Sequence, residues 1–457
     1  MIGGGNAGLC AAIEARAQGA EVLLVEHAPR ELRAGNSRHT RNFRAMHNAP
    51  TETLTDTYTE EEYWQDLYRV TQGATDENLA RQMIRGSEEL LDWYAEKGVH
   101  FQPALSGTLS LSHSNAFFLG GGKALVNSLY HHAETSGVEI LYDAEATGLE
   151  ITDGCFKSAS INMNGETQTI TAKAVVIASG GFQSNEAWMV EAWGDAAKNF
   201  LIRGTAYNTG TMLKALMDGG AATVSDPTQC HAVAIDARGP KYDGGIVTRL
   251  DCVCCSIVVN TLGKRFYDEG EDYWPKRYAI WGRLIAQQPE QRAYAIVDDK
   301  VTHQYMPSLF PPMTANSLTE LAEIIGIEGA VLEHTVASFN AAVQAGDYDP
   351  DTLDGCRTMG LQPDKSNWAL ALDTPPYSAF PLSPGITFTY LGVQVDDQAR
   401  VVFTDTGSAA NIFAAGEVMA GNILGQGYCA GTGMAIGGVF GRLAGHNAGA
   451  TSVGGSS

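Results

Sequence analysis

The 457-residue sequence predicts an α/β fold in which one domain is interrupted by a second, inserted α+β domain. A glycine-rich turn at residues 3–8 is followed by a helical pattern, and apolar runs typical of buried strands occur at 21–26 and 174–178. From residue 229 the elements become shorter and richer in proline, and the sheet-like pattern returns near 388. We therefore expect a first domain over residues 1–228 and 388–457 and a capping domain over 229–387.

The turn has the spacing G-x-G-x-x-G, which permits a tight strand-to-helix connection and lets backbone N–H groups approach a pyrophosphate. The strand at 21–26 ends in Glu26, eighteen residues after the last glycine, where a ribose hydroxyl needs an acceptor. This combination predicts a Rossmann-like dinucleotide site formed by Gly3, Gly5, Asn6, Ala7, Gly8 and Glu26. Only Met1 and Ile2 precede the turn, so either the first strand is unusually short or the start has been trimmed.

The other elements are predicted from the spacing of apolar residues and from turn residues. Asp153-Gly154 indicates a hairpin between two strands, and Ser179-Gly180-Gly181 ends a buried strand. Residues 445–457 are small and of low complexity, so we expect a loosely held tail. Helices are expected at 9–17, within 59–100, and at 123–136, 318–325 and 331–344, and further strands at 138–142, 146–151, 155–163, 391–396 and 411–415.

The net charge of −22 disfavours nucleic acid and anionic membrane surfaces as partners. A small anionic ligand would therefore need a local cluster of cations. The C-x-C-C run at 252–255 lacks the paired spacing of a zinc site, so no metal is expected. Scattered cysteines, together with the lack of a signal-peptide pattern or a membrane-spanning apolar run, predict a soluble, cytoplasmic protein.

Two segments are unusually basic for so acidic a chain. Residues 32–51 contain no carboxylate, and residues 229–283 hold eight lysines and arginines against seven acids. The first segment is either an anion-facing loop or a solvated face, and we favour the loop. The cations of the second segment either form a ligand clamp or make ordinary surface ion pairs.

Several stretches form a specific set, namely residues 3–8, Gly35-Asn36-Ser37, 174–182, Gln229-Cys230-His231, 258–266 and 413–418. On these stretches the chain resembles the fumarate reductase and succinate dehydrogenase flavoprotein superfamily over nearly its whole length. Within it, residues 36–42, 114–122 and 267–281 are most similar to the FAD-dependent tricarballylate dehydrogenases, which oxidise tricarballylate to cis-aconitate. A ring-contraction flavoprotein family of the cobalamin pathway is similar in the same stretches.

The resemblance implies bound FAD, a capping domain that closes over the flavin, and hydride transfer between a substrate carbon and flavin N5. It also implies a separate membrane or iron–sulfur electron-transfer partner. In succinate dehydrogenases a histidine attaches FAD covalently, and its place here is nearest Asn36, so we expect noncovalent FAD. Together with the glycine-rich strand ends, the resemblance implies further FAD-binding residues, namely Asn36, Ser37, Gly121, Gly122, Ala146, Ala178, Gly180, Gly416, Glu417, Gly433 and Ile436.

The sequence departs from fumarate reductases where these bind substrate. Phe388 stands in place of the histidine of their His-Thr-Met-Gly-Gly run, and Tyr428 stands near the place of a family arginine. Thr302 stands where the proton-donating arginine should follow Asp298 and Asp299. The sequence therefore has the residues that the resemblance associates with FAD binding, but it lacks those that bind the dicarboxylate in fumarate reductases. We expect a substrate other than fumarate.

Desaturation next to a carboxylate needs a hydride acceptor, cations that hold the carboxylates, and a base for the proton. Arginine suits the clamp because its planar fork binds carboxylates bidentately. The expected catalytic and substrate-binding residues are Arg249, Arg277, His231, Tyr390, Tyr428, Arg41 and His39, with core packing as the alternative for the two tyrosines. The favoured function is oxidation of a small polycarboxylate such as tricarballylate. The alternatives are action on a tetrapyrrole, or an electron-carrying flavin subunit without its own substrate.

Overall fold

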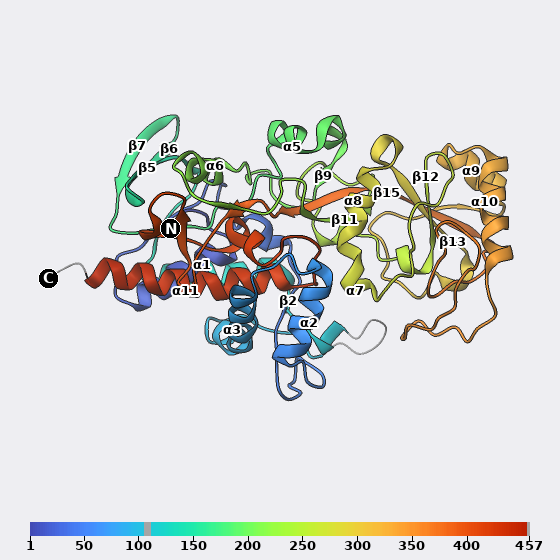
Figure 1. Ribbon diagram of the computed structural model, residues 1–457, viewed down its shortest axis with the longest axis horizontal. Coiled ribbons are helices and arrows are strands. Elements are labelled where there is room, and N and C mark those ends of the chain that lie inside the picture. The colour runs from blue at the N-terminus through green and yellow to red at the C-terminus, as the bar shows by residue number, and fades with distance from the viewer. Residues whose placement is uncertain (105–110, 455–457) are drawn as a thin grey trace.

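A computed structural model describes residues 1–104 and 111–454. Two regions lie side by side (Figure 1). One holds the N-terminal glycine-rich turn and the C-terminal helix, and the other holds most of the chain between residues 230 and 376. The α/β class is confirmed, whereas the predicted boundaries at 228/229 and 387/388 stay predictions.

The first region is built on a mostly parallel sheet. Its strands are β1 (Leu23–Val25), β4 (Glu139–Leu141), β8 (Val175–Ile177), β17 (Arg400–Phe403) and β18 (Gly407–Ala414). β1 pairs with β4 and β8 pairs with β18, in both cases in parallel, and β17 adds an antiparallel edge. Ile2 joins the two halves by parallel bridges to Val25 and Ile177. The glycine-rich turn therefore starts at the centre of the sheet.

Helices of the first region pack on this sheet and on one another. They are α1 (Asn6–Ala17), α2 (Glu60–Thr71), α3 (Glu77–Glu96), α4 (Gly121–Thr135) and α11 (Thr432–Gly454). α11 lies against α1 at very short distance, since a Cβ on Gly441 or Gly445 would lie 2.6 or 2.2 Å from a backbone oxygen of α1. The prediction of a loose tail is therefore wrong for residues 445–454, because their glycines are small enough to pack helix on helix. Residues 455–457 lie outside the described residues.

A three-stranded antiparallel sheet flanks the first region. It consists of β5 (Ala144–Thr152), β6 (Cys155–Met163) and β7 (Glu166–Thr171), with α6 (Thr211–Asp218) against β5. The expected hairpin is confirmed, because Thr152 pairs with Cys155 and both turn residues have positive φ, 51° at Asp153 and 69° at Gly154. Those dihedral angles match the turn that follows the right-handed twist of paired strands.

The second region has its own sheet around the long strand β15 (Tyr377–Thr389). β11 (Cys230–Asp236), β13 (Ala293–Val297), β14 (Met313–Ala315) and the short β9 (Leu201–Ile202) pair with β15, and β12 (Ile257–Asn260) pairs with β13. The helices here are α7 (Trp274–Arg277), α8 (Trp281–Ala286), α9 (Leu318–Ile325) and α10 (Gly329–Ala342). β15 runs from this region toward the first one (Figure 1).

The remaining elements are β2 (Asn42–Arg44), β3 (Asn115–Phe117), α5 (Glu186–Trp193), β10 (Thr223–Val224) and β16 (Gly392–Val393). Within the strand predicted at 391–396, Gly392 and Val393 form β16, and Val395 makes an isolated bridge to Val401. No helix within residues 1–104 and 111–454 combines the length and apolar character needed to cross a membrane.

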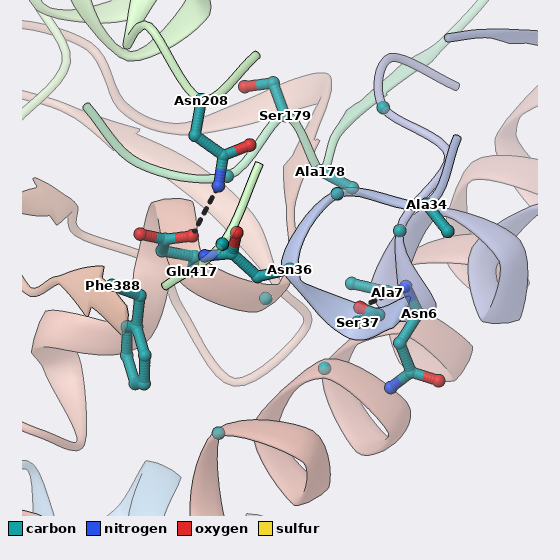
Figure 2. A pocket seen from close by; sticks show the side chains of 18 of the residues that line it. Asn6, Ala7, Ala34, Asn36, Ser37, Ala178, Ser179, Asn208, Phe388 and Glu417 are labelled. Carbon is teal, nitrogen blue, oxygen red and sulfur yellow. Dashed lines mark hydrogen bonds between the residues drawn. The ribbon is translucent and has the colours of Figure 1, made fainter. Parts of the chain in front are cut away.

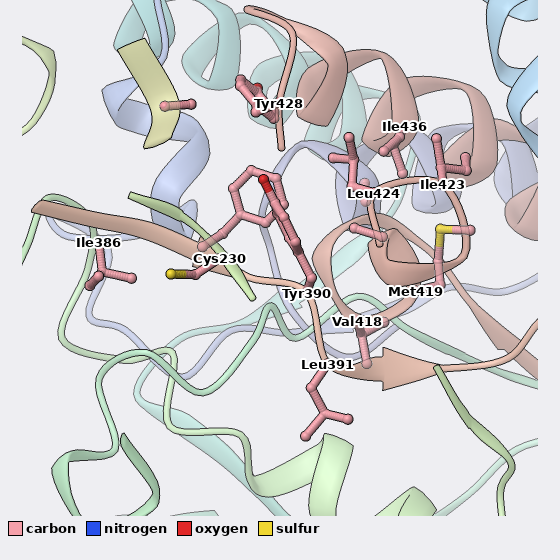
Figure 3. Packing of buried hydrophobic residues seen from close by; sticks show 14 of the residues in the cluster. Cys230, Ile386, Tyr390, Leu391, Val418, Met419, Ile423, Leu424, Tyr428 and Ile436 are labelled. Atoms are coloured by element: carbon pink, nitrogen blue, oxygen red, sulfur yellow. The ribbon is translucent and has the colours of Figure 1, made fainter. Parts of the chain in front are cut away.

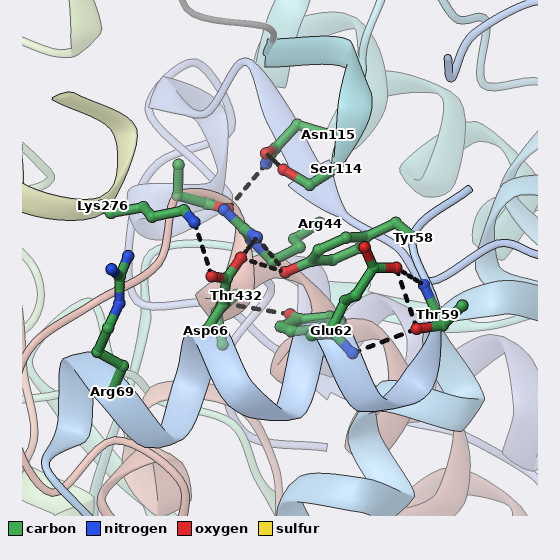
Figure 4. A network of polar contacts seen from close by, with 12 residues as sticks. Arg44, Tyr58, Thr59, Glu62, Asp66, Arg69, Ser114, Asn115, Lys276 and Thr432 are labelled. Atoms are coloured by element: carbon green, nitrogen blue, oxygen red, sulfur yellow. Dashed lines mark hydrogen bonds and ion pairs between the residues drawn. The ribbon is translucent and has the colours of Figure 1, made fainter. Parts of the chain in front are cut away.

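One buried apolar cluster continues from the first region into the second. Where they meet it includes Cys230 and Ile386 of the second sheet and Tyr390, Met419 and Leu424 of the following chain (Figure 3). Polar contacts join the regions as well (Figure 4). Asp66 of α2 pairs with Lys276 of α7, and Arg69 pairs with Asp272, both at 2.7 Å. The two regions therefore share a core and an ion-pair contact.

Candidate functional site

A long cavity follows the junction of the two regions. It begins at the glycine-rich turn and the ends of β1 and β8, passes the 3-10 helix η1 (Gly35–His39), and ends between β11, β15 and residue 249. Figure 2 shows Asn6, Ser37 and Ala178 on one side and Glu417 and Phe388 on the other. The carboxyl ends of parallel strands thus open into the cavity, as in other open α/β sheets that bind ligands.

The turn presents backbone N–H groups to the cavity at the start of α1. Gly3 has φ +101°, and a Cβ there would lie 2.4 Å from the oxygen of Ala178, so the turn can approach β8 only with glycine. A Cβ on Gly5 would find no atom nearer than 3.4 Å, which leaves the α1 N-terminus open. Such a start attracts an anion, because its N–H groups and helix dipole point outward.

Glu26 lies at the end of β1 and is 5% exposed. Its carboxylate accepts hydrogen bonds from the backbone N–H groups of Gly4, Ala28 and Ala34 at 3.2, 2.9 and 3.2 Å. Burial raises its pKa even though these hydrogen bonds oppose the shift. The side chain therefore fixes the loop after β1 and also lines the cavity.

The loop at η1 is tied to β15 and to residue 205. The Asn36 amide donates to the Thr387 carbonyl at 2.5 Å and accepts from the Thr205 N–H at 2.9 Å. The Ser37 hydroxyl accepts from the Asn6 N–H at 2.9 Å, at the first residue of α1. These contacts hold the loop between the turn and the second sheet, where it forms one wall of the cavity.

Glu417 is a second buried carboxyl group in the cavity. Burial raises its pKa to about 8, although several hydrogen bonds favour the charged form. It accepts from the Thr389 N–H at 3.0 Å and from the Asn208 amide at 3.2 Å (Figure 2). Burial therefore favours the neutral form of this carboxyl group, and in that form it can donate a hydrogen bond.

Three arginines meet at the far end of the cavity: Arg41, Arg203 and Arg249. Arg249 pairs with buried Asp251 at 2.7 Å, and its guanidinium lies 4.9 Å from the ring centroid of Tyr278. Burial, followed by the charge of Arg249, lowers the pKa of Arg41 and of Arg203 to about 10. Neither has a carboxylate within ion-pair distance in the described part of the chain. This end of the cavity is therefore electropositive despite the acidic protein.

His231, on β11, lies beside these cations. Its ring stacks on Tyr428, and Tyr278 and Phe388 approach it edge on. Among the described residues, neither ring nitrogen has a hydrogen-bond partner. An orphaned, buried imidazole in a cavity is ready to hydrogen bond to a ligand, because leaving it unpaired costs free energy.

Most of the residues predicted for a ligand line this one cavity. His39 lies there too, with its Nε2 2.6 Å from an oxygen of Asp243. The lining residues among the predicted ones are Gly3, Gly5, Asn6, Ala7, Glu26, Asn36, Ser37, Ala146, Ala178, Gly180, Gly416, Glu417 and Gly433 for the cofactor, and Arg41, His39, Arg249, His231 and Tyr428 for the substrate.

Two predicted substrate residues need correction. Arg277 does not line the cavity, because its guanidinium bonds Glu271 and the Tyr267 hydroxyl. Tyr390 is fully buried behind Phe388, and its hydroxyl donates to the Gly427 carbonyl at 2.6 Å. Arg277 therefore forms an ion pair within the second region. Tyr390 has the core-packing role that was predicted as the alternative to substrate binding.

Four predicted cofactor residues also lie outside the cavity lining. A Cβ on Gly8 or Gly122 would meet a backbone carbonyl oxygen at 1.8 or 2.2 Å, so each allows backbone segments to pack. Gly121 opens α4 beside the Thr40 carbonyl, and Ile436 is buried in the core. These residues support the cavity walls.

The sequence interpretation missed Arg203, Thr387, Asn208 and Tyr278, which all line the cavity. Arg203 directly follows the two-residue strand β9, in which Leu201 is half-buried and Ile202 is buried, and Thr387 lies on the long strand β15. A cation immediately after a short apolar run is the available sequence signal for Arg203, and it is weak because a two-residue strand has no periodicity.

A family model described as an FAD binding domain matches residues 1–434. The chain is 28% identical over 473 residues to a fumarate reductase (cytochrome) of Shewanella frigidimarina, covering 98% of this chain and 76% of that protein. It is 26% identical to an NADH:fumarate oxidoreductase of Klebsiella pneumoniae, covering 98% of this chain but only 47% of that protein. The open conformation of a flavocytochrome c3 fumarate reductase superposes with a TM-score of 0.77 at 24% identity, over 99% of this chain and 78% of that one.

Proposed function

Since this chain belongs to the FAD-binding domain family and has FAD as its cofactor, we propose that it is an oxidoreductase that desaturates a small polycarboxylate. The proposed reaction is oxidation of tricarballylate to cis-aconitate. The observation that carries this proposal is the meeting of Arg41, Arg203 and Arg249 at one end of the cavity, where Asp251 pairs with Arg249 alone.

The residues present fit FAD. The open α1 N-terminus suits a pyrophosphate, and buried Glu26 lies where an acceptor for a ribose hydroxyl is needed. Asn36 and Ser37 contribute further polar atoms to the wall. In our proposal FAD is held by these contacts without a covalent bond. When bound, FAD supplies the acceptor for a hydride.

The arginines then bind and orient the carboxylates of the substrate. With Asp251 as their one counter-ion, they leave two positive charges uncompensated, which favours a polyanion over a neutral ligand. Phe388 and Tyr428 form an apolar wall that excludes water beside them. His231 presents a neutral imidazole whose free ring nitrogen can take a proton from the carbon next to a bound carboxylate.

Electron transfer to a separate partner is part of the same proposal, as is a capping role for residues 229–387. The chain spans about half of the length of the Klebsiella relative, so the route of the electrons is proposed from the resemblance alone. A cytoplasmic location is also proposed, with support from eight cysteines that form no disulfide.

The test is anaerobic reduction of the FAD-loaded protein by a panel of di- and tricarboxylates. Tricarballylate is expected to bleach the visible absorbance of the flavin faster than succinate does. The proposal fails if no polycarboxylate bleaches the flavin, or if succinate is the preferred substrate.

A further inference from the structure

Arg203 is held firmly at the junction of the two regions. Its backbone N–H donates to the Ile386 carbonyl of β15 at 2.9 Å, and its carbonyl accepts from the Gly245 N–H at 2.8 Å. Its side chain donates to the Gly245 carbonyl at 3.3 Å and to the Thr387 hydroxyl at 2.9 Å. Only 4% of the residue is exposed, so the guanidinium has a fixed place in the cavity wall.

This guanidinium differs from that of Arg249 in having no carboxylate partner in residues 1–104 or 111–454. Its two side-chain hydrogen bonds go to neutral oxygens, which leaves other N–H groups of the fork available. Burying a cation without a counter-ion is costly, and a bound carboxylate would offset that cost. A dicarboxylate held by Arg41 and Arg249 would leave the charge of Arg203 unpaired, whereas the third carboxylate of a tricarboxylate can pair with it.

We propose that Arg203 is a specificity-determining residue that binds one carboxylate of the substrate and so separates tricarboxylates from dicarboxylates. The inference rests on the proposed function, whose substrate class it narrows. Thr387 positions the guanidinium by accepting its hydrogen bond.

The test is calorimetric titration of the FAD-loaded protein with tricarballylate and with succinate. Arg203→Gln is expected to weaken tricarballylate binding by about ten- to a hundredfold, the worth of a charge-assisted hydrogen bond, and succinate binding much less. Its FAD content should equal that of the wild type. Arg357→Gln, which removes an exposed arginine outside the cavity, should change neither affinity.

Equal weakening of both acids, loss of FAD, or unchanged binding by Arg203→Gln would each overturn the inference while leaving the proposed function standing. A wild-type protein that binds neither acid would overturn both. If Arg203→Gln fails to fold, Thr387→Val decides, because it keeps the cation and removes its hydrogen-bond acceptor. That variant should show a smaller loss in the same direction, and an unchanged ratio of the two affinities would contradict the assignment.

Discussion

The imidazole of His231 lies flat against the ring of Tyr428, with ring centroids 3.9 Å apart and 18° between the planes. The stack encloses a histidine that has no hydrogen-bond partner for either nitrogen among the described residues. Burial, and then the charges of Arg203 and Arg249, hold its pKa well below 6.5. His231 is therefore neutral at pH 7. It can accept a hydrogen bond, or it can act as a base that takes up a proton.

A first prediction concerns the pH dependence of stability. Because the pKa of His231 is lower in the folded protein, the unfolded chain binds its proton first as the pH falls through about 6.5, and folding is then penalised. His231→Gln should remove this penalty. Between about pH 6.5 and pH 5, its melting temperature should fall less than that of the wild type, whereas above about pH 7.5 the difference between the two proteins should be constant.

The matched control is His303→Gln, because His303 is an exposed histidine outside the cavity. Its melting temperature should follow the wild type at every pH. Parallel melting curves for His231→Gln and the wild type between pH 5 and 8 would show that the imidazole is not held neutral.

A second prediction compares two arginines of the same basic segment. Arg249→Lys keeps the charge but loses the planar fork, and should lower kcat/KM for tricarballylate by about ten- to a hundredfold. Arg277→Lys should leave kcat/KM within about twofold, because Arg277 pairs with Glu271 away from the cavity. Steady-state kinetics on both variants measure the contrast, and equal losses would contradict the placement of the clamp.

Features that depend on neighbouring residues can be predicted from the sequence, whereas the direction of a side chain and contacts between distant residues cannot. The hairpin at Asp153 and Gly154 and the position of Glu26 in the cavity wall were predictable, because each depends on residues close together in the chain. Arg277 was misplaced because local charge density does not reveal which way a side chain points from a four-residue helix. Arg203 reaches the cavity only because β9 pairs in parallel with β15, a contact between residues far apart in sequence.

The tail was misjudged for a related reason. Glycine disfavours an isolated helix, and the small residues of 445–457 predict a loosely held tail. In the fold these glycines let α11 lie against α1, so tertiary packing outweighs the local preference. The predicted domain boundaries remain expectations. β9 precedes the predicted boundary at 228/229 in sequence, yet it pairs with β15 in the sheet of the second region.

A third prediction tests the turn. Gly5 has φ −72°, which alanine adopts without strain, and its Cβ would lie 3.4 Å from the Ser37 hydroxyl on the cavity side. Gly5→Ala should therefore fold with a nearly unchanged apoprotein melting temperature but bind FAD at least about tenfold more weakly, because the methyl group obstructs the approach to the α1 N–H groups.

Gly148→Ala is the control for Gly5→Ala, since its Cβ would meet nothing nearer than 4.0 Å and lies in β5, outside the cavity. FAD affinity is measured by flavin fluorescence quenching during reconstitution of apoprotein. Unchanged affinity in Gly5→Ala would mean that the turn does not approach the pyrophosphate.

A fourth prediction concerns the attachment of FAD. Asn36 stands nearest the place of the histidine that attaches FAD in succinate dehydrogenases, and its amide is occupied by Thr387 and Thr205. Amide nitrogen is not a nucleophile for such a bond. Acid precipitation should therefore release all the yellow colour into the supernatant, as measured by absorbance, and yellow colour that stays with the washed pellet would contradict noncovalent binding.

The last prediction is that the second region must move for turnover. Arg203 and Arg249 are buried, so a substrate reaches them only if the contact between the regions opens. Arg69 and Asp272 form an ion pair across that contact at 2.7 Å. Replacing both by cysteine and joining them with a short thiol-cleavable crosslinker should stop tricarballylate oxidation while FAD stays bound. Each single cysteine variant should remain active after the same treatment, and reduction of the crosslink should restore the double variant. Full activity of the crosslinked protein would mean that the substrate enters without separation of α2 from the segment before α7.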